Sequence, residues 1–119
     1  MTDCIFCQII AKTAPSDIFY EDDQCLVIRN INPLAPTHLL VLPKKHFDSL
    51  NDMTAADETL AGHLLLTARL IAERLNLTDA GYRLAINSGR GVGQTVFHLH
   101  VHLLSGCEMD DSLLSRGLK

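Results

Sequence analysis

The stretch Phe97-His98-Leu99-His100-Val101-His102-Leu103-Leu104 alternates three histidines with aliphatic residues in strict period two. Successive side chains of a β-strand point to opposite faces, so this pattern predicts one strand with all three imidazoles on one face and the aliphatic residues toward the core. A single histidine is usually a surface or packing residue, but three on one strand face indicate binding or catalysis. We therefore take His98, His100 and His102 as candidate catalytic residues.

Metal binding and phosphate chemistry both suit such a row of imidazoles. Neutral imidazole is the commonest zinc ligand. Residues two apart on a strand have Cα atoms about 6.6 Å apart, however, whereas the ligand nitrogens around one zinc ion lie within about 3.5 Å of one another. One ion can take two of the histidines, but not all three comfortably. The remaining explanation is that the histidines bind an anion or act as nucleophile and proton carriers, roles that suit phosphorus chemistry.

A glycine-rich segment lies directly upstream of the histidines. Residues 87–95 read Asn-Ser-Gly-Arg-Gly-Val-Gly-Gln-Thr, and the backbone N–H groups of such a turn can close on anionic oxygens. The segment lacks the Gly-Lys-Ser/Thr ending of a Walker loop. Next to the histidines it favours a phosphate ligand, with Gly93 as a backbone donor and Gln94 and Thr95 as side-chain donors.

The rest of the chain predicts an α+β domain. Short aliphatic and β-branched runs predict about five strands, at residues 18–20, 25–29, 38–42, 82–87 and 96–104. The first two are joined by four polar residues, which requires an antiparallel hairpin. A long helix is expected from its N-cap Thr54 to Leu75 or Asn76, with an apolar stripe wide enough for burial on two sides. A short helix from Cys4 to Ala11 should turn inward the residues Ile5, Ile9 and Ile10.

Length and composition indicate one compact domain, residues 1–119, and exclude several functions. The chain has 119 residues, 47% of them hydrophobic, and a formal net charge of −4, so it has no general basic surface for nucleic acid. It has no Trp and six Phe or Tyr residues, which is little material for base stacking. No run is long enough to span a membrane and no secretory signal is recognisable, so we expect a cytoplasmic protein that binds neither nucleic acid nor membrane.

Cysteines suggest a second site. The pair in Cys4-Ile5-Phe6-Cys7 has the spacing of one half of a structural zinc site and needs two further ligands. A redox role for the pair is the lesser alternative, because the βαβ setting of thioredoxin is missing. We expect Cys25, Cys107 and His63 to be packing, turn or surface residues without chemistry.

The histidine run and several other segments resemble the histidine triad (HIT) family. The motif of that family, His-x-His-x-His followed by two hydrophobic residues, is matched within the stretch from Gly93 to Leu104. Further similar segments are distributed over most of the chain: Ile5-Phe6, Ile9-Ile10, Tyr20-Glu21-Asp22-Asp23, Pro36-Thr37-His38, Pro43-Lys44-Lys45-His46, Gly81-Tyr82-Arg83 and Asn87. A short C-terminal extension, about residues 106–119, resembles the Hint branch of bacteria.

This resemblance implies a HIT-like fold that forms a two-fold homodimer through the long helix and the fourth strand. It also implies a purine nucleoside phosphoramidase, which binds a purine nucleoside monophosphate or phosphoramidate and cleaves the P–N bond. His100 would attack the α-phosphorus and form a nucleotidyl-histidine, without a metal or other cofactor in the reaction. His102 and the backbone near Gly93 would hold phosphate oxygens, and Thr95 would donate to the leaving group.

The resemblance also assigns supporting residues. His38 would orient the triad, Asn87 would contact phosphate or ribose, and Asn30 stands where Hint relatives usually carry an aspartate that accepts the ribose hydroxyls. The purine ring would lie among four aliphatic and aromatic residues, Ile5, Phe6, Ile9 and Ile31. A structural zinc ion would be held by Cys4, Cys7, His46 and His98.

Two alternative functions stay open on the sequence. One is a dinucleoside polyphosphate hydrolase, which shares the triad but belongs to a branch with a different C-terminal sequence. The other is a zinc-stabilised nucleotide-binding adaptor whose catalysis is incidental to a partner interaction. An adaptor should bind nucleotide tightly and turn it over negligibly.

Overall fold

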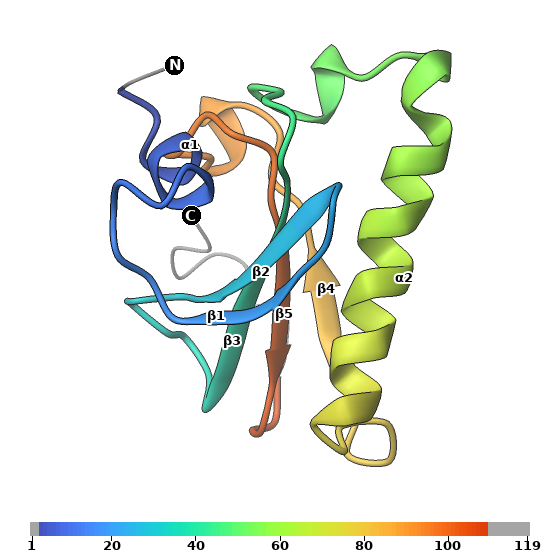
Figure 1. Ribbon diagram of the computed structural model, residues 1–119. Helices are drawn as coiled ribbons and strands as arrows, with labels where there is room; N and C mark the ends of the chain where they lie inside the picture. Colours follow the sequence, from blue (N-terminus) through green and yellow to red (C-terminus); the bar gives the residue numbers. More distant parts are fainter. Residues whose placement is uncertain (1–2, 110–119) are drawn as a thin grey trace.

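The computed structural model describes residues 3–109, which form one five-stranded antiparallel sheet with a helix on each face (Figure 1). The strand order is β1-β2-β3-β5-β4, so the predicted α+β class with about five strands is confirmed. The elements are α1 (Ile5–Ile10), β1 (Ile18–Glu21), β2 (Cys25–Arg29), β3 (Thr37–Pro43), α2 (Glu58–Arg74), β4 (Arg83–Ala85) and β5 (Val101–Ser105), with short 3₁₀ turns at Leu50–Asp52, Ala55–Asp57 and Arg90–Val92.

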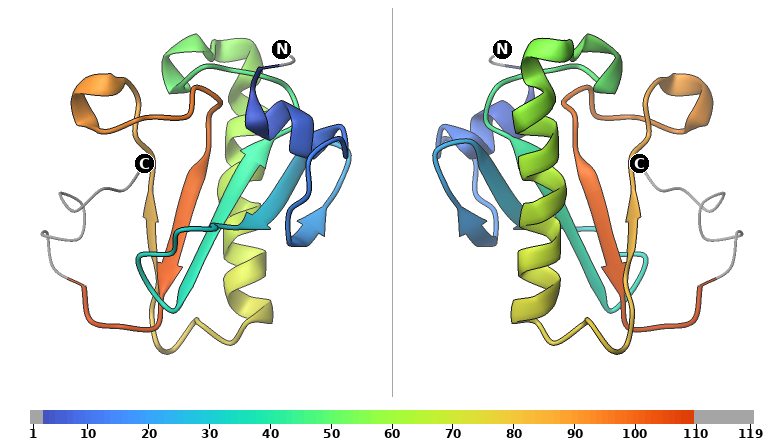
Figure 2. Two further views of the ribbon diagram at one scale, coloured as in Figure 1. Left: turned by 90° about the vertical axis from the view of Figure 1, so that its left-hand side faces the viewer. Right: turned by 90° about the vertical axis from the view of Figure 1, so that its right-hand side faces the viewer.

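The alternation of side chains along the strands gives the sheet two hydrophobic faces. On β3, Leu39 and Val41 belong to the core that packs against α2, while Leu40 and Leu42 belong to a second core under α1. Figure 2 shows α2 and α1 on opposite sides of the sheet. Because β3 and β5 are paired with Leu40 opposite His102, His102 shares the α1 face with Leu40 and with His38, which lies two residues before Leu40 on β3.

Thr54 caps a helical segment, as predicted, but the α-helix α2 itself begins four residues later, at Glu58. The Thr54 hydroxyl accepts the N–H of Ala56 at 3.2 Å, and the Asp57 carboxylate accepts the N–H of Thr54 at 2.9 Å. These bonds start a 3₁₀ turn that continues into α2 at Glu58. The helix buries one stripe against the sheet and leaves Leu65 and Leu66 exposed, at 47% and 65% of their surface. No helix within residues 3–109 is both long and apolar enough to cross a membrane.

Strand β5 begins at Val101, five residues later than the sequence pattern predicted. Its ladder with β3 ends at the pair Val41–Val101, and β3 itself ends at Pro43, which has no N–H to donate. The next stretch is held differently, since the N–H of Leu99 donates to the carbonyl of Phe47 at 2.7 Å. Strand β4 is also shorter than the predicted 82–87.

Helix α1 corrects one expectation about its buried face. Ile5 was expected inward, but it is 44% exposed, and Phe6 and Ile9 are the residues that pack on the sheet. The Cys4 and Cys7 sulfurs lie 3.4 and 3.3 Å from ring nitrogens of His98 and His46, and in this orientation Phe6 and Ile9, three residues apart, share the face that packs on the sheet. Ile10 is half-buried against the same core, as predicted.

His63, for which no chemistry was predicted, ties α2 to the β1–β2 turn. Its Nε2 lies 2.7 Å from the carboxylate of Asp22, which also accepts the backbone N–H groups of Gln24 and Cys25. Burial by itself raises the pKa of Asp22, but these hydrogen bonds outweigh it and hold the pKa well below its usual value. The contact fixes α2 over the sheet and gives His63 a structural role.

Candidate active site and metal-ligand cluster

The histidines form a row of rings along the α1 face, with the ring of Phe6 between His98 and His100. The centroids of His100 and His102 are 4.9 Å apart, and those of His102 and His38 are 5.1 Å apart. Phe6 of α1 stands edge-on to both His98 and His100, at 5.8 and 5.3 Å. All three triad histidines are at most 4% exposed. The sequence-predicted candidates are therefore brought together, and α1 supplies the aromatic ring that separates the two ends of the row.

A backbone carbonyl determines the tautomer of His100. Its Nδ1 lies 2.7 Å from the carbonyl oxygen of His98, which can only accept, so Nδ1 carries the proton and donates it. In the neutral ring the lone pair is then on Nε2. This is the electronic state that a nucleophilic imidazole needs.

His38 and His102 form a chain of hydrogen bonds with one direction. The N–H of Leu34 donates to Nδ1 of His38 at 3.0 Å, which leaves the proton of the neutral His38 ring on Nε2. That Nε2 lies 2.9 Å from Nδ1 of His102 and donates to it. The proton of neutral His102 is thus on Nε2, a buried atom with no hydrogen-bond partner among residues 3–109. An orphaned, buried N–H donor is well suited to an anionic oxygen of a ligand.

Burial keeps these imidazoles neutral. It lowers the pKa of His102 to about 3 and that of His38 to about 4, with a further contribution from the neighbouring His100 in both cases. His98 has its pKa lowered to about 4, again mainly by burial. The tautomers derived above for His38 and His102 are therefore the states present near neutral pH.

A cluster of two thiols and two imidazoles lies at the other end of the row. One ligand atom from each of Cys4, Cys7, His46 and His98 falls within 4.8 Å of the others. The Nδ1 atoms of His46 and His98 are 3.1 Å apart, and the sulfur of Cys4 is 3.4 Å from Nδ1 of His98. These spacings suit the tetrahedral coordination of a single zinc ion.

Hydrogen bonds also turn the lone pairs of this cluster inward. Nε2 of His98 donates to the carbonyl of Pro43 at 2.8 Å, and Nε2 of His46 donates to the Asp48 carboxylate at 2.7 Å. In the neutral rings both Nδ1 atoms carry lone pairs that face each other across 3.1 Å. Burial raises the pKa of the Cys7 thiol to about 11, and hydrogen bonding to Cys4 adds to the effect. Two neutral imidazoles oriented in this way, beside two thiols, form a donor set that fits a cation.

The glycine loop is built as a turn that its own glutamine holds together. Gly89 and Gly93 have φ angles of +106° and +101°, a region that favours glycine. The Gln94 side chain is 2% exposed; its amide N–H₂ donates to the carbonyls of Asp48 and Val96, and its oxygen accepts the N–H of Gly89. The Gln94 side-chain donors that were assigned to a ligand are thus already engaged in this structure.

The backbone donors expected in the loop are engaged as well. The N–H of Gly93 donates to the carbonyl of Arg90 and that of Gln94 donates to the carbonyl of Gly89, both at 3.1 Å. The N–H groups of this short turn thus donate to carbonyl groups of the same turn. The number of glycines in the sequence does not predict this. Thr95 is exposed and Asn87 is half-buried at the two ends of the segment.

The residues assigned to a purine nucleoside lie partly in the core and partly on the surface. Phe6 and Ile9 are each 7% exposed, whereas Ile31 is 88% exposed. Asn30 and Ile31 line an open cavity of about 480 Å³ together with Asp17 and Arg29. Of the four residues assigned to the base, Ile31 lines this cavity, Ile5 is 44% exposed, and Phe6 and Ile9 have little surface left to offer a ligand.

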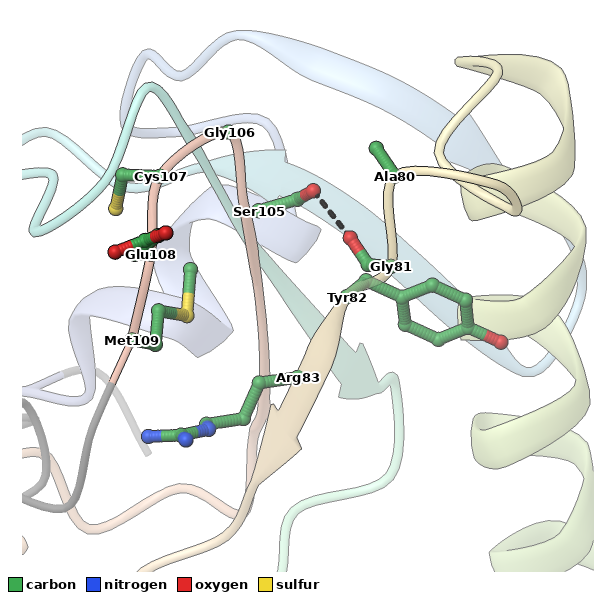
Figure 3. A pocket seen from close by; sticks show the side chains of 9 residues that line it. All are labelled: Ala80, Gly81, Tyr82, Arg83, Ser105, Gly106, Cys107, Glu108 and Met109. Carbon is green, nitrogen blue, oxygen red and sulfur yellow. Dashed lines mark hydrogen bonds between the residues drawn. The ribbon is translucent and has the colours of Figure 1, made fainter.

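A second cavity, of about 540 Å³, opens between the turn before β4 and the segment after β5 (Figure 3). Its wall is held by the Ser105 hydroxyl, which donates to the carbonyl of Gly81 at 2.6 Å. It is lined by Ala80, Gly81, Tyr82, Arg83, Ser105, Gly106, Cys107, Glu108 and Met109. No imidazole lines it, so it is separate from the row of histidines.

Comparison with known proteins identifies the family. Residues 11–109 match the family model of the HIT domain. The chain is 52% identical over 104 residues to an uncharacterized HIT-like protein of Synechococcus elongatus, a match that covers 87% of this chain and 90% of that protein. This chain belongs to the HIT family. It is also 46% identical over 104 residues to Protein HitA of Neisseria gonorrhoeae, covering 87% of this chain and 96% of that protein.

Solved structures of the HIT family share the fold. A HIT family hydrolase from Legionella pneumophila superposes with a TM-score of 0.89 at 42% identity, covering 91% of this chain and 96% of that one. A histidine triad nucleotide-binding protein from Candida albicans superposes with a TM-score of 0.79 at 27% identity, covering 96% and 91%. The predicted HIT-like fold is therefore confirmed. Most of the predicted C-terminal extension, residues 110–119, lies outside the described residues.

Sequence reasoning missed the groups that orient the imidazoles of this HIT chain. They are the N–H of Leu34, the carbonyls of Pro43 and His98, and the Asp48 carboxylate. Of these groups, only Asp48 could have been predicted from the sequence, because it lies two residues after His46, where a carboxylate can reach the ring of a metal ligand. The backbone groups could not, because they do not depend on residue type.

The buried histidines of the HIT chain predict a stability that depends on pH. His38 and His102 have lower pKa values folded than their ordinary 6.5, so the unfolded chain binds more protons below pH 6.5. Above pH 6.5 both histidines are neutral in the folded and the unfolded chain, and the free energy of unfolding has its full value. As the pH falls toward 4, the unfolded chain takes up protons that the folded chain does not, and the free energy of unfolding decreases by on the order of several kcal/mol. Urea unfolding between pH 7.5 and 4.5 should show this decrease, and His38→Asn should make the dependence of stability on pH less steep.

This pH range lies above the one in which Asp22 titrates, because the ordinary pKa of Asp22 is 3.8 and the folded chain lowers it. An unchanged urea midpoint down to pH 4.5 would contradict the assignment to the two histidines.

Proposed function

We propose that this HIT chain hydrolyses purine nucleoside 5′-phosphoramidates through a nucleotide covalently bound to His100. The observation that carries the proposal is the pairing of two adjacent rings in complementary states. His100 has its lone pair on Nε2, and His102, 4.9 Å away, has a buried proton on Nε2 that lacks a partner among the described residues. Together they offer a nucleophile for phosphorus and a donor for a phosphoryl oxygen.

The reaction proceeds in two displacements. The lone pair on Nε2 of His100 attacks the α-phosphorus, the P–N bond breaks, and the nitrogen leaves with the electron pair and takes a proton. We assign the relay of that proton from solvent to the hydroxyl of Thr95, which is exposed. Water then attacks the same phosphorus and returns one proton to solvent, the bond from phosphorus to Nε2 breaks with its electron pair going back to Nε2, and the nucleoside monophosphate is released with His100 neutral again.

His102 acts as a hydrogen-bond donor in both steps. Because its Nδ1 accepts from His38, its Nε2–H can donate to a non-bridging oxygen while the ring stays neutral. His38 is thus the positioning residue that sets the tautomer of His102. The low pKa of His102 agrees with this role, since burial opposes a second proton.

Nucleotide binding is proposed at the cavity beside Asn30 and Ile31. The amide of Asn30 meets the ribose hydroxyls, and the exposed faces of Ile5 and Ile31 hold the base together with the edges of Phe6 and Ile9. Asn87 and the segment around Gly93 border the end of the site that holds the phosphate. The nucleotide-binding HIT relative from Candida albicans and the hydrolase from Legionella pneumophila support this assignment of function.

We also propose that two copies form a two-fold dimer through α2 and β4. Strand β4 is an edge of the sheet in the described residues, and Leu65 and Leu66 expose apolar surface on α2. Sedimentation equilibrium of the purified protein tests this assembly. A monomer at micromolar concentration would contradict it.

We propose that the cluster of Cys4, Cys7, His46 and His98 holds one structural zinc ion. Four protein ligands make a closed site, so the ion would fix α1 against the sheet and take no part in the chemistry. It would use only the first triad histidine, which leaves His100 and His102 for phosphate.

Metal analysis tests the zinc site. The purified protein should contain about one zinc ion per chain, and Cys7→Ser together with His46→Asn should abolish it, because two ligands are then too few for tight binding. Cys107→Ser is the matched control, since Cys107 is exposed and distant from the cluster in sequence. Wild-type protein that contains no zinc and has freely reactive Cys4 and Cys7 would remove the site.

Release of AMP from adenosine 5′-phosphoramidate tests the proposed function. Wild-type protein should turn over without added metal, and His100→Ala should lower kcat by at least about 10³-fold, because the nucleophile is lost. His63→Ala, on the opposite face of the sheet, should keep kcat within a few fold. Tight AMP binding without turnover by the wild type would instead favour an adaptor, and turnover of dinucleoside polyphosphates alone would favour the other hydrolase branch.

A further inference from the structure

Asn30 faces His38 with a group that cannot accept its proton. The N–H of Asn32 donates to Oδ1 of Asn30 at 2.9 Å, which fixes the orientation of the amide, because a backbone N–H is always a donor. The amide nitrogen Nδ2 then lies 3.3 Å from Nε2 of His38. Both of these atoms carry protons, so the contact is not a hydrogen bond.

The only acceptor that the described residues offer to Nε2–H of His38 is therefore Nδ1 of His102, at 2.9 Å. A carboxylate of the same shape at position 30 would offer the Nε2–H of His38 a second acceptor. One of its oxygens would still accept from Asn32, and the other would face His38 and compete for its proton. His102 Nδ1 would then lose its donor and could take up a proton of its own, stabilised by a negative charge two hydrogen bonds away.

We propose that position 30, by placing an uncharged amide N–H instead of a carboxylate beside His38, leaves the His38 proton to His102 and so leaves His102 neutral with its proton on Nε2. Position 30 thereby sets the charge of the phosphate-facing end of the triad. The consequence for catalysis rests on the proposed function, but the charge state of the pair does not.

The surroundings of the pair agree with this assignment. His38 is 3% exposed and His102 is 1% exposed, and the titratable group that affects both is His100. On β4 the residue opposite His102 is Ala85, and the cation of that strand, Arg83, is opposite Leu104. From the loop after β2 the pair meets the backbone of Leu34 and the amide of Asn30.

Two charged residues remain near position 30. Arg29 and Asp17 line the cavity beside Asn30, and both are exposed. Exposed charges are screened by water and salt, so they have less effect on a buried imidazole than a carboxylate in contact with it. The residue at position 30 is thus the one through which a charge could reach His38 directly.

Nitrogen-15 NMR of the histidine side chains in the free protein tests the proposal. In the wild type, His102 should show a neutral ring protonated at Nε2 from pH 7.5 to 5.5. In Asn30→Asp, the pKa of the His38–His102 pair should rise by at least about one unit, and a charged ring should be present at pH 6. Asn30→Ala is the matched control; it removes the amide without adding charge and should keep the neutral state.

The proposal is overturned if Asn30→Asp leaves the His38 and His102 signals as in the wild type, or if Asn30→Ala produces the same charged ring. Nucleotide affinity gives a second measure. The ratio of the AMP dissociation constants of wild type and Asn30→Asp should rise by roughly threefold or more between pH 7.5 and 5.5, because a charged donor binds phosphate more tightly. The ratio cancels the titration of AMP itself, and a constant ratio would count against the proposal.

These outcomes are separable from the proposed function. If neither protein turns over a phosphoramidate but the NMR signals differ as expected, the function fails and the role of Asn30 holds. If the wild type turns over and the signals do not differ, the reverse is true. Should Asn30→Asp fail to fold, the wild type alone still decides, since a His102 ring protonated at Nδ1 or charged at pH 6 contradicts the proposal.

Discussion

A neutral imidazole has one proton for two nitrogens, so a group that engages one nitrogen decides the chemistry of the other. In this HIT chain that decision is made by fixed polar groups around the rings. The carbonyl of His98 accepts the Nδ1–H of His100, and the N–H of Leu34 donates to Nδ1 of His38. The backbone thus leaves a lone pair on Nε2 of neutral His100 and, through His38, a proton on Nε2 of neutral His102.

Burial makes those assignments effective. An exposed imidazole exchanges protons with water and populates both tautomers, but His98, His100 and His102 are at most 4% exposed. The sheet provides this burial on one side and α1 provides it on the other, through the Phe6 ring. Since α1 has only six residues, its position depends on packing and on the cluster at Cys4 and Cys7, which ties the candidate metal site to the candidate active site.

The sequence was sufficient for those features that depend on spacing along the chain. Alternation predicted that His98, His100 and His102 would share a face, and the limit of one ion for two of them agrees with a metal-ligand cluster that uses His98 alone. The Cys-x₂-Cys spacing predicted half of that cluster, and the resemblance to HIT proteins named His46. The five strands and the capped start of α2 were likewise local signals.

Features that depend on tertiary contacts could not be predicted. The ladder of β5 ends early because Pro43, on a different strand, has no N–H. Phe6 takes the place expected for Ile5 because Cys4 and Cys7 of α1 face His98 and His46, which are distant in the sequence. Gln94 had the residue type of a ligand donor, yet it holds the loop to Asp48 and Gly89. The direction of the hydrogen bonds from Leu34 through His38 to His102 depends on a backbone N–H group, which nearly every residue has. No residue type in the sequence therefore predicts it.

The central claim is that hydrogen bonding fixes Nε2 of His100 as the attacking atom. The most direct measurement is rapid quenching of the reaction with adenosine 5′-phosphoramidate at alkaline pH, followed by phosphorus-31 NMR and mass spectrometry of the trapped peptide. We predict one adenylated residue, His100, with phosphorus on Nε2. An adduct on Nδ1, an adduct on another histidine, or full turnover without any adduct in the quenched protein would contradict the account.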